Sequence, residues 1–217
     1  MKKGLIILGI IVAVVIFVII WCVNVRNGII SYDQNVDEAW GNVENQYQRR
    51  LDLIPNLVNA VKGYAQHESS TFEKVTEARA GLKQAYDAAK TATTDQTPED
   101  LQKFQQTQAN LNRQLGIYIN AVHEAYPDLK ANQNFMDLQV QLEGTENRIA
   151  TERTRYNAAV KEYNTKILQF PGSMFSWGYS KKQMFSADPE ASRAPKVDFG
   201  TDSSSTSTTT TSSDDDF

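Results

Sequence analysis

The sequence has little of what most enzyme and metal sites require. Its one cysteine, Cys22, excludes an intramolecular disulfide and a cysteine-based structural zinc site. The two histidines, His67 and His123, follow Tyr64 and Asn120 by three residues, so the Glu-x-x-His pairs of di-metal helical bundles are absent. The sequence also lacks a glycine-rich phosphate loop and a Gly-x-Ser-x-Gly turn. These absences predict no catalytic residue, no metal site and no cofactor, and we expect the protein not to be an enzyme.

A surplus of positive charge is missing too. The 22 lysines and arginines stand against 26 aspartates and glutamates, for a net charge of −4. The aspartates at positions 202, 214, 215 and 216 account for that charge, so residues 1–200 are neutral. Binding to phosphates needs a basic surplus, and we therefore expect no nucleic acid partner. Residues 201–217 are nearly all serine, threonine and aspartate, which predicts a disordered tail.

One long hydrophobic run is present near the start of the chain. Gly4–Val23 contains no charged side chain, and as a helix it would be about 30 Å long, the thickness of a bilayer core. A cleaved signal peptide fits less well, because its apolar region is shorter and ends in small residues, whereas this run ends in Trp21 and Cys22. Tryptophan at that place is typical of the membrane interface. Residues 1–26 are therefore predicted to be a single-pass anchor in the cell membrane, with the lipid bilayer as partner.

The basic residues on either side of this run predict its orientation. Lys2 and Lys3 precede it, and only Arg26 follows it closely. Positive residues favour the cytoplasmic side, so we expect a cytoplasmic N-terminus and an extracytoplasmic body.

The soluble part is dominated by a helical stripe near its end. The stripe advances by three or four residues at a time and is apolar except at Thr145 and Glu152. Its positions are Phe135, Leu138, Leu142, Thr145, Ile149, Glu152, Tyr156, Val160, Tyr163, Ile167 and Phe170. No proline interrupts it, so one helix of about 54 Å is predicted, starting near Asn132.

Three further helices are predicted before it. The first runs from about Ser31 to Ala65 and is bent at Pro55, with a break into two helices at Ile54 as the alternative. The second runs from about Ser69 to Ala92, capped by Ser69 or Ser70. The third has Thr97 as its cap and Pro98 at its first position, carries an apolar stripe from Leu101 to Ala125, and ends at the Tyr126-Pro127-Asp128 turn.

These four amphipathic helices with short connections predict an all-α fold. We expect an antiparallel up-and-down four-helix bundle over residues 27–170, preceded by the transmembrane helix. Residues 171–200 carry too many aromatics for a linker, and we expect them to pack on the bundle with their aromatic side chains in its grooves.

Polar residues lie close to the apolar stripes and form the candidate site. A polar layer inside the bundle would bind a small ligand or a partner's motif; alternatively, it would be a hydrogen-bonding network that fixes the register of the helices. The candidate residues are Arg50, Asp52, Asn56, Glu77, Arg79, Glu146, Asn147, Arg148, Asn157 and Asn164.

Several ordered motifs make the sequence similar to one known family. They include RRLDLIPNLV at 49–58, VTEAR at 75–79, EAYPDLKAN at 124–132, LEGTENRI at 142–149 and PKVDF at 195–199. With these motifs the chain resembles the LemA family over roughly residues 1–199. The resemblance implies a membrane protein anchored at its N-terminus with an all-α, four-helix body, and it does not supply an enzymatic activity. The candidate polar residues all fall within motif-bearing segments, which also include YN at 156–157 and EYN at 162–164.

Three functions remain open from the sequence. The leading one is a non-enzymatic, membrane-anchored interaction module or scaffold with a membrane protein as its partner. The alternative is a sensor that binds a small ligand at the polar layer around Pro55 and at the face bearing Asn157 and Asn164. The third, an enzyme using Glu68 or Glu146 as acid or base, has only the presence of carboxylates in its favour.

Overall fold

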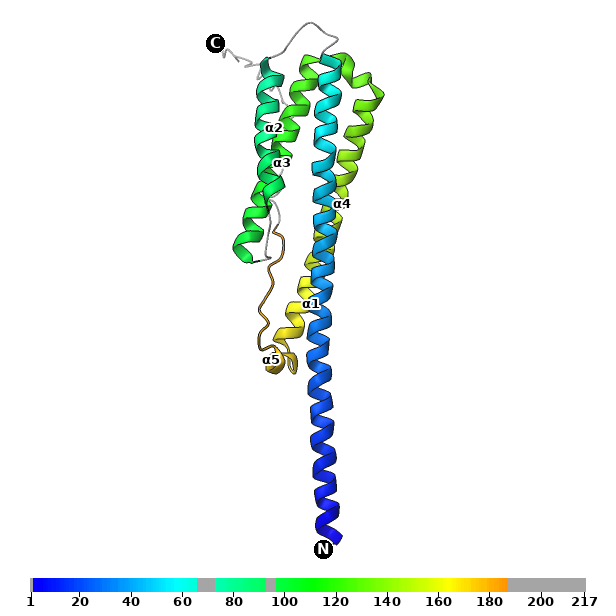
Figure 1. The fold of residues 1–217 in the computed structure, drawn as a ribbon, viewed down its shortest axis with the longest axis vertical. Helices are drawn as coiled ribbons and strands as arrows, with labels where there is room; N and C mark the ends of the chain where they lie inside the picture. The colour runs from blue at the N-terminus through cyan, green and yellow to red at the C-terminus, as the bar shows by residue number, and fades with distance from the viewer. Residues whose placement is uncertain (1, 66–72, 93–96, 187–217) are drawn as a thin grey trace, which may run out of the picture. The chain divides into compact units, whose positions relative to one another are not determined.

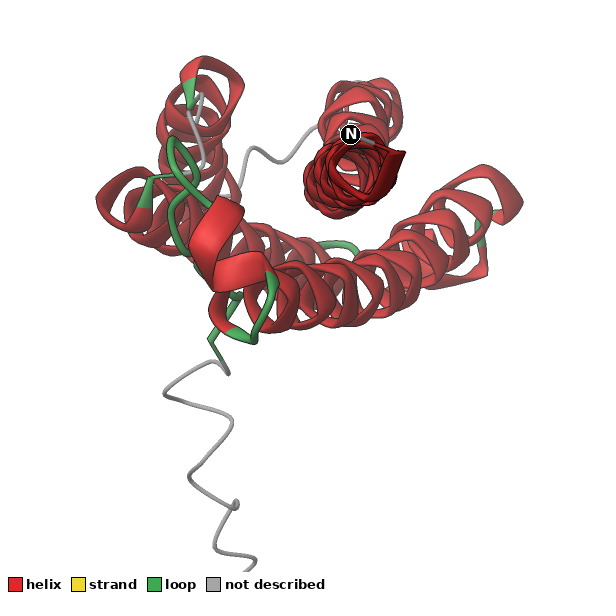
Figure 2. Ribbon diagram, turned by 90° about the horizontal axis from the view of Figure 1, so that it is seen from below, coloured by secondary structure: helices red, strands yellow, loops and turns green. Residues whose placement is uncertain are grey.

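The described part of the chain is helical throughout. This computed structural model describes residues 2–65, 73–92 and 97–186, and all of its regular elements are helices (Figures 1 and 2). The elements are α1 (Lys2–Ala65), α2 (Glu73–Thr91), α3 (Pro98–Ala125), the 3-10 helix η1 (Pro127–Ala131), α4 (Gln133–Leu168) and α5 (Gly172–Phe175). The predicted all-α class is therefore confirmed. The predicted caps at Ser69 or Ser70, the aromatic Phe199 and the tail from 201 lie outside the described residues.

Helix α1 joins the hydrophobic run to the soluble body without a break. It has 64 residues and continues through Pro55, so the alternative of two helices broken at Ile54 is wrong. Since the side chains of Leu53, Ile54 and Leu57 are buried around Pro55, packing of the turn offsets the hydrogen bond that proline cannot donate. The large apolar side chains from Ile6 to Val23 are exposed. In the described residues, α1 is the one helix long and apolar enough to cross a membrane.

The helices form two antiparallel pairs, α1 with α4 and α2 with α3. In the first pair Gly28 lies against Lys166, whereas Arg50 binds Glu146 at 2.7 Å. In the second pair Lys74 lies 3.7 Å from Glu124. Helix α1 also runs parallel to α3, with contacts between Tyr47 and Phe104 and between Tyr64 and Tyr126, the residue that follows α3. These contacts are those of a helical bundle, although the full up-and-down order of four helices stays a prediction.

The buried side chains divide into two cores. The aliphatic core contains Leu51, Leu53, Ile54, Leu57, Val61, Val75, Ala78, Leu82, Ala85, Ala89, Leu111, Leu115, Tyr118, Val122, Tyr126, Leu129, Phe135 and Leu142. The aromatic core contains Ile29, Val36, Trp40, Val43, Tyr47, Leu101, Phe104, Ile149, Tyr156, Val160, Tyr163, Ile167 and Phe185. Helix α2 contributes only to the aliphatic core.

The ends of α3 and α4 follow the sequence signals closely. Thr97 caps α3 by accepting a hydrogen bond from the Asp100 backbone N–H at 3.2 Å, and Asn132 caps α4 in the same way at Phe135. The far end of α4 differs from the prediction. Helix α4 ends at Leu168, and Phe170 is 74% exposed, so placing Phe170 in the buried stripe was wrong. The chain must turn before Pro171, and this turn carries Phe170 away from the core.

After α5 a tight turn sends the chain back along α4. The Tyr179 N–H donates to the Ser176 carbonyl at 2.8 Å, and Gly178 between them has φ of +86°, a conformation that favours glycine. The following residues 180–185 carry no regular secondary structure and run beside the lower part of the α1–α4 pair, which extends beyond α2 and α3 (Figure 1). We call residues 180–185 the returning segment.

Candidate functional site

A buried arginine lies at the boundary between the two cores. Arg50 on α1 is 2% exposed; it donates to the Glu146 carboxylate on α4 at 2.7 Å and to the Gln108 side-chain oxygen on α3. Its guanidinium also lies over the Tyr47 ring, 5.1 Å from the centroid. On each of the three helices the residues before and after this layer belong to different cores. The Arg50 side chain therefore joins α1 to both α3 and α4.

The other candidates near this layer point outward. Asp52, Asn56, Glu77, Arg79, Asn147 and Arg148 are all exposed. Asp52 accepts from Gln48 at 2.7 Å, and Arg148 donates to the Thr145 hydroxyl at 3.1 Å, so both make contacts within their own helix. The predicted residues therefore do not converge on one internal site: the structure brings together Arg50 and Glu146, and separately Asn157 and Asn164.

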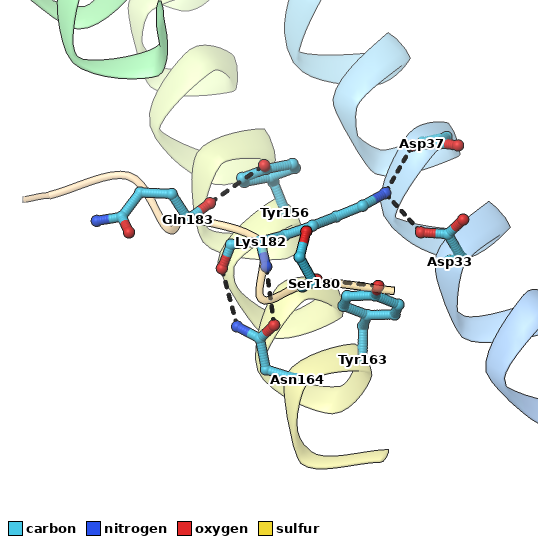
Figure 3. A network of polar contacts seen from close by, with 8 residues as sticks. All are labelled: Asp33, Asp37, Tyr156, Tyr163, Asn164, Ser180, Lys182 and Gln183. Carbon is cyan, nitrogen blue, oxygen red and sulfur yellow. Dashed lines mark hydrogen bonds and ion pairs between the residues drawn. The ribbon is translucent and has the colours of Figure 1, made fainter. Parts of the chain in front are cut away.

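Asn157 and Asn164 bind the backbone of the returning segment. The Asn164 amide donates to the Lys182 carbonyl at 2.9 Å and accepts from the Lys182 N–H at 3.0 Å (Figure 3). Asn157 repeats this arrangement at Phe185, with distances of 3.1 and 2.8 Å. Each asparagine therefore satisfies both backbone groups of one residue, as a neighbouring β-strand would.

The tyrosine preceding each asparagine adds a further backbone contact. The Tyr163 hydroxyl donates to the Ser180 carbonyl at 3.1 Å, and the Tyr156 hydroxyl donates to the Gln183 carbonyl at 3.2 Å (Figure 3). Burial raises the pKa of both tyrosines to about 12. Both hydroxyls therefore remain protonated donors at neutral pH.

The Lys182 side chain crosses from the returning segment to α1. Its ammonium group lies 2.8 Å from Asp33 and 2.9 Å from Asp37, one turn apart on α1 (Figure 3). Burial pushes the pKa of Lys182 down, but the hydrogen bonds and charges of the two aspartates outweigh burial and raise it above the usual 10.5. Lys182 thus links both helices, because its backbone binds Asn164 on α4 and its ammonium group binds the two aspartates on α1.

Phe185 completes the aromatic core. Its ring stacks on Trp40 at 5.8 Å between centroids and meets Tyr156 edge-on at 5.2 Å. The Arg153 guanidinium lies over it at 4.9 Å. Of the aromatic side chains after residue 170 that we expected in grooves, Phe185 is buried in this core, whereas Trp177 is 88% exposed.

Sequence reasoning selected Asn157 and Asn164 but missed their tyrosine, aspartate and lysine companions. The repeated Tyr-Asn dipeptide, seven residues apart, was the available signal for Tyr156 and Tyr163. Nothing local marks Lys182, Asp33 or Asp37, because their contact joins residues 145 or more positions apart.

Among the described residues, surface hollows also occur away from the returning segment. A cavity of about 180 Å³ is lined by Ile54, Pro55, Val58, Asn59, Arg79, Leu82, Lys83 and Tyr86. A second, of about 440 Å³, is lined by Tyr32, Ala158, Lys161, Glu162, Thr165, Lys166 and Gln169. Within the described residues, no group of three or more histidine, cysteine or acidic side chains is placed to hold a metal ion.

These features define a class of protein: an all-α body continuous with one helix that is long and apolar enough to cross a membrane. The LemA family model matches residues 39–199, and the chain belongs to the LemA family.

Several curated relatives are similar over much of the chain. Magnetosome protein MamQ 2 of Paramagnetospirillum magneticum is 25% identical over 75% of this chain and 65% of its own length. Magnetosome protein MamQ of Magnetospirillum gryphiswaldense is 23% identical over the same shares. Protein LemA of Metamycoplasma hominis is 26% identical over 67% of this chain and 61% of its own length. The chain thus spans slightly less than two thirds of the curated relatives that it matches.

Proposed function

We propose that this LemA-family chain is a membrane-tethered, non-enzymatic interaction module whose body lies on the extracytoplasmic side. The observation that carries the proposal is the continuity of α1 from the exposed apolar run to the buried stripe. A helix without an interruption holds the body at a fixed distance and angle from the lipid, as a scaffold requires.

Exposed apolar residues beside the run support its placement in a membrane. Phe175 of α5 meets Trp21 edge-on at 6.1 Å between ring centroids. On either side of Phe175 the side chains of Phe170, Met174 and Trp177 are exposed. Aromatic residues gathered at the end of an apolar span are typical of the lipid–water interface.

Tryptophan fluorescence tests this placement. The chain has three tryptophans, so changing Trp21→Phe and Trp40→Phe leaves Trp177 as the one emitter. In vesicles containing brominated lipids, we expect Trp177 emission to be blue-shifted and quenched. Emission like that of tryptophan in water, without quenching, would contradict the interface placement.

Photo-crosslinking tests the interaction. A crosslinking amino acid at the exposed Glu162, beside the larger hollow, should give a reproducible product with a membrane protein, whereas one at Asp87 on α2 serves as the matched surface control. Inserting a flexible glycine–serine linker between Val23 and Asn24 should lower the yield, because it uncouples body from anchor. If no position on either surface gives a product above background, the interaction role fails.

The cavity at Pro55 favours a second function, a small-ligand sensor. Its lining combines the apolar Ile54, Val58 and Leu82 with the cationic Arg79 and Lys83, a pattern suited to an anion with an apolar part. Ligand binding to the folded state raises the melting temperature. An anionic metabolite should raise it in the unaltered chain and in Arg148→Ala but not in Arg79→Ala, and a flat response across a metabolite panel would exclude the sensor.

A further inference from the structure

We propose that the groove between α1 and α4 is a binding site for an extended peptide bearing lysine and, three residues later, phenylalanine. In this structure the chain's own returning segment fills the site. A partner protein with the same spacing competes for it, and the inference rests on the proposed interaction function, since it names the class of partner.

The groove contacts mainly the peptide backbone. Asn164 and Asn157 bond the N–H and C=O of residues 182 and 185, and Tyr163 and Tyr156 donate to the carbonyls of residues 180 and 183. None of these six contacts depends on the side chain of the bound residue, except that proline would remove a donor at 182 or 185. A set of contacts of this kind accepts many sequences in an extended conformation.

The spacing of α4 matches the rise of an extended chain. The two Tyr-Asn dipeptides are seven residues apart, which along a helix is about 10.5 Å. Tyr163-Asn164 contacts residues 180 and 182 of the returning segment, and Tyr156-Asn157 contacts residues 183 and 185, three positions later. Three residues of an extended chain span about 10 Å. Two contact units therefore repeat in register. The unit is absent one heptad earlier, at Ile149-Ala150, so the site ends near residue 185.

Two side-chain pockets supply selectivity. Asp33 and Asp37 place two carboxylates around one ammonium group, so this end of the groove favours a cation. Trp40, Tyr156 and Arg153 surround the Phe185 ring, so the other end favours an aromatic residue. The required pattern is Lys-x-x-Phe, because the two pockets are separated by the three peptide residues that also separate the contacts of the two Tyr-Asn dipeptides.

In the described part of the chain, the groove is not covered by another long helix, because α2 and α3 are shorter than α1 and α4. Helix α2 contributes nothing to the aromatic core, and α3 adds only Leu101 and Phe104 at its beginning. Towards the hydrophobic run, beyond Leu101 and Phe104, the α1–α4 pair is contacted by the short helix α5, and the returning segment covers the rest of this stretch (Figure 1). Covalent attachment gives the segment a high effective concentration, so a partner binds well only when the segment is weakened or released.

The test uses the full chain in detergent micelles with its own segment weakened by Lys182→Ala and Phe185→Ala. The probe is a fluorescent synthetic peptide with the sequence of residues 179–186. We expect it to bind this variant at least about tenfold more tightly than the unaltered chain, whose own segment occupies the groove. Adding Asn157→Ala and Asn164→Ala should abolish binding, whereas adding Asn147→Ala, at an exposed asparagine of α4, should leave it unchanged.

Unlabelled competitors test the lysine pocket and the spacing between the two pockets. One competitor carries alanine at the position of Lys182, and another carries an extra glycine between that lysine and the phenylalanine. Each should compete about tenfold more weakly than the parent peptide. Equal competition by all three would overturn the Lys-x-x-Phe requirement.

Three outcomes would overturn the proposal. In the first, the probe does not bind the weakened chain although its circular dichroism is unaltered. In the second, the probe binds equally well after Asn157 and Asn164 are changed to alanine. In the third, only a second copy of the chain fills the groove, which is seen as a doubled mass. The Glu162 crosslinks separate the two levels of inference, because a membrane partner captured without peptide binding would refute this site and leave the interaction function standing.

Discussion

The two cores use different chemistry, and they share α1, α3 and α4 but not α2. The aliphatic core has three aromatic residues among its 18 members and joins α2 tightly to its neighbours through alanine. The aromatic core has six among 13, and hydroxyl and amide side chains at its edge reach the returning segment. Close packing of small residues leaves no room for another chain, whereas large rings with polar tips provide both a wall and hydrogen-bonding groups. The difference explains why the groove lies at one end.

The largest effect is expected from truncating the aliphatic core. Leu111 is 0% exposed, so Leu111→Ala should lower the free energy of unfolding by about 3 kcal/mol through lost burial and a cavity. Denaturant unfolding followed by circular dichroism measures the change. A loss below about 1 kcal/mol would show that this core is loosely packed and would weaken the comparison.

The boundary between the cores should be nearly as sensitive. Glu146→Ala leaves the buried Arg50 guanidinium without its carboxylate, and we expect a loss of about 2–3 kcal/mol, discounted because Glu146 is 32% exposed. Glu143→Ala, an exposed position on the same helix, is the control and should change stability little. Equal effects of the two substitutions would show that the buried charge pair does not stabilise the bundle.

The sequence predicted the helices well because their signals are local. Stripe spacing, the Thr97 cap and the Tyr126-Pro127 turn each depend on residues within a few positions. The returning segment lies beyond such reasoning, since Lys182 and Asp33 are far apart in the sequence and meet only through the tertiary fold. The exposed Trp177 was misplaced because composition alone does not distinguish an aromatic residue on the surface from one in a core.

Alkaline pH should act on both cores through tyrosine. Burial raises the pKa of Tyr118 in the aliphatic core and of Tyr156 and Tyr163 in the aromatic core to about 12, from about 10 when unfolded. Stability from these groups is complete below pH 10 and is lost as the pH rises towards 12. Absorbance at 295 nm should therefore show tyrosines that ionise only as helical circular dichroism falls. Full ionisation near pH 10 with the helices intact would contradict this burial.

The smallest effect is expected at an exposed pair outside both cores. Lys83 and Asp87 on α2 are 2.6 Å apart but mostly exposed, so Asp87→Asn should change stability by no more than about 0.5 kcal/mol. Thermal unfolding in low and moderate salt checks this. A loss of more than about 1 kcal/mol would mean that surface charge matters to α2 as much as its alanine packing.

The most direct measurement is amide hydrogen exchange at Lys182 and Phe185 in the full chain. Their N–H groups donate to Asn164 and Asn157, so both amides should be protected, and Asn157→Ala with Asn164→Ala should speed their exchange by about tenfold or more. Amides of the aliphatic core should keep their rates in that variant, and Asn147→Ala should change neither region. If Lys182 and Phe185 exchange at unprotected rates in the unaltered chain, the returning segment does not occupy the groove and the account fails.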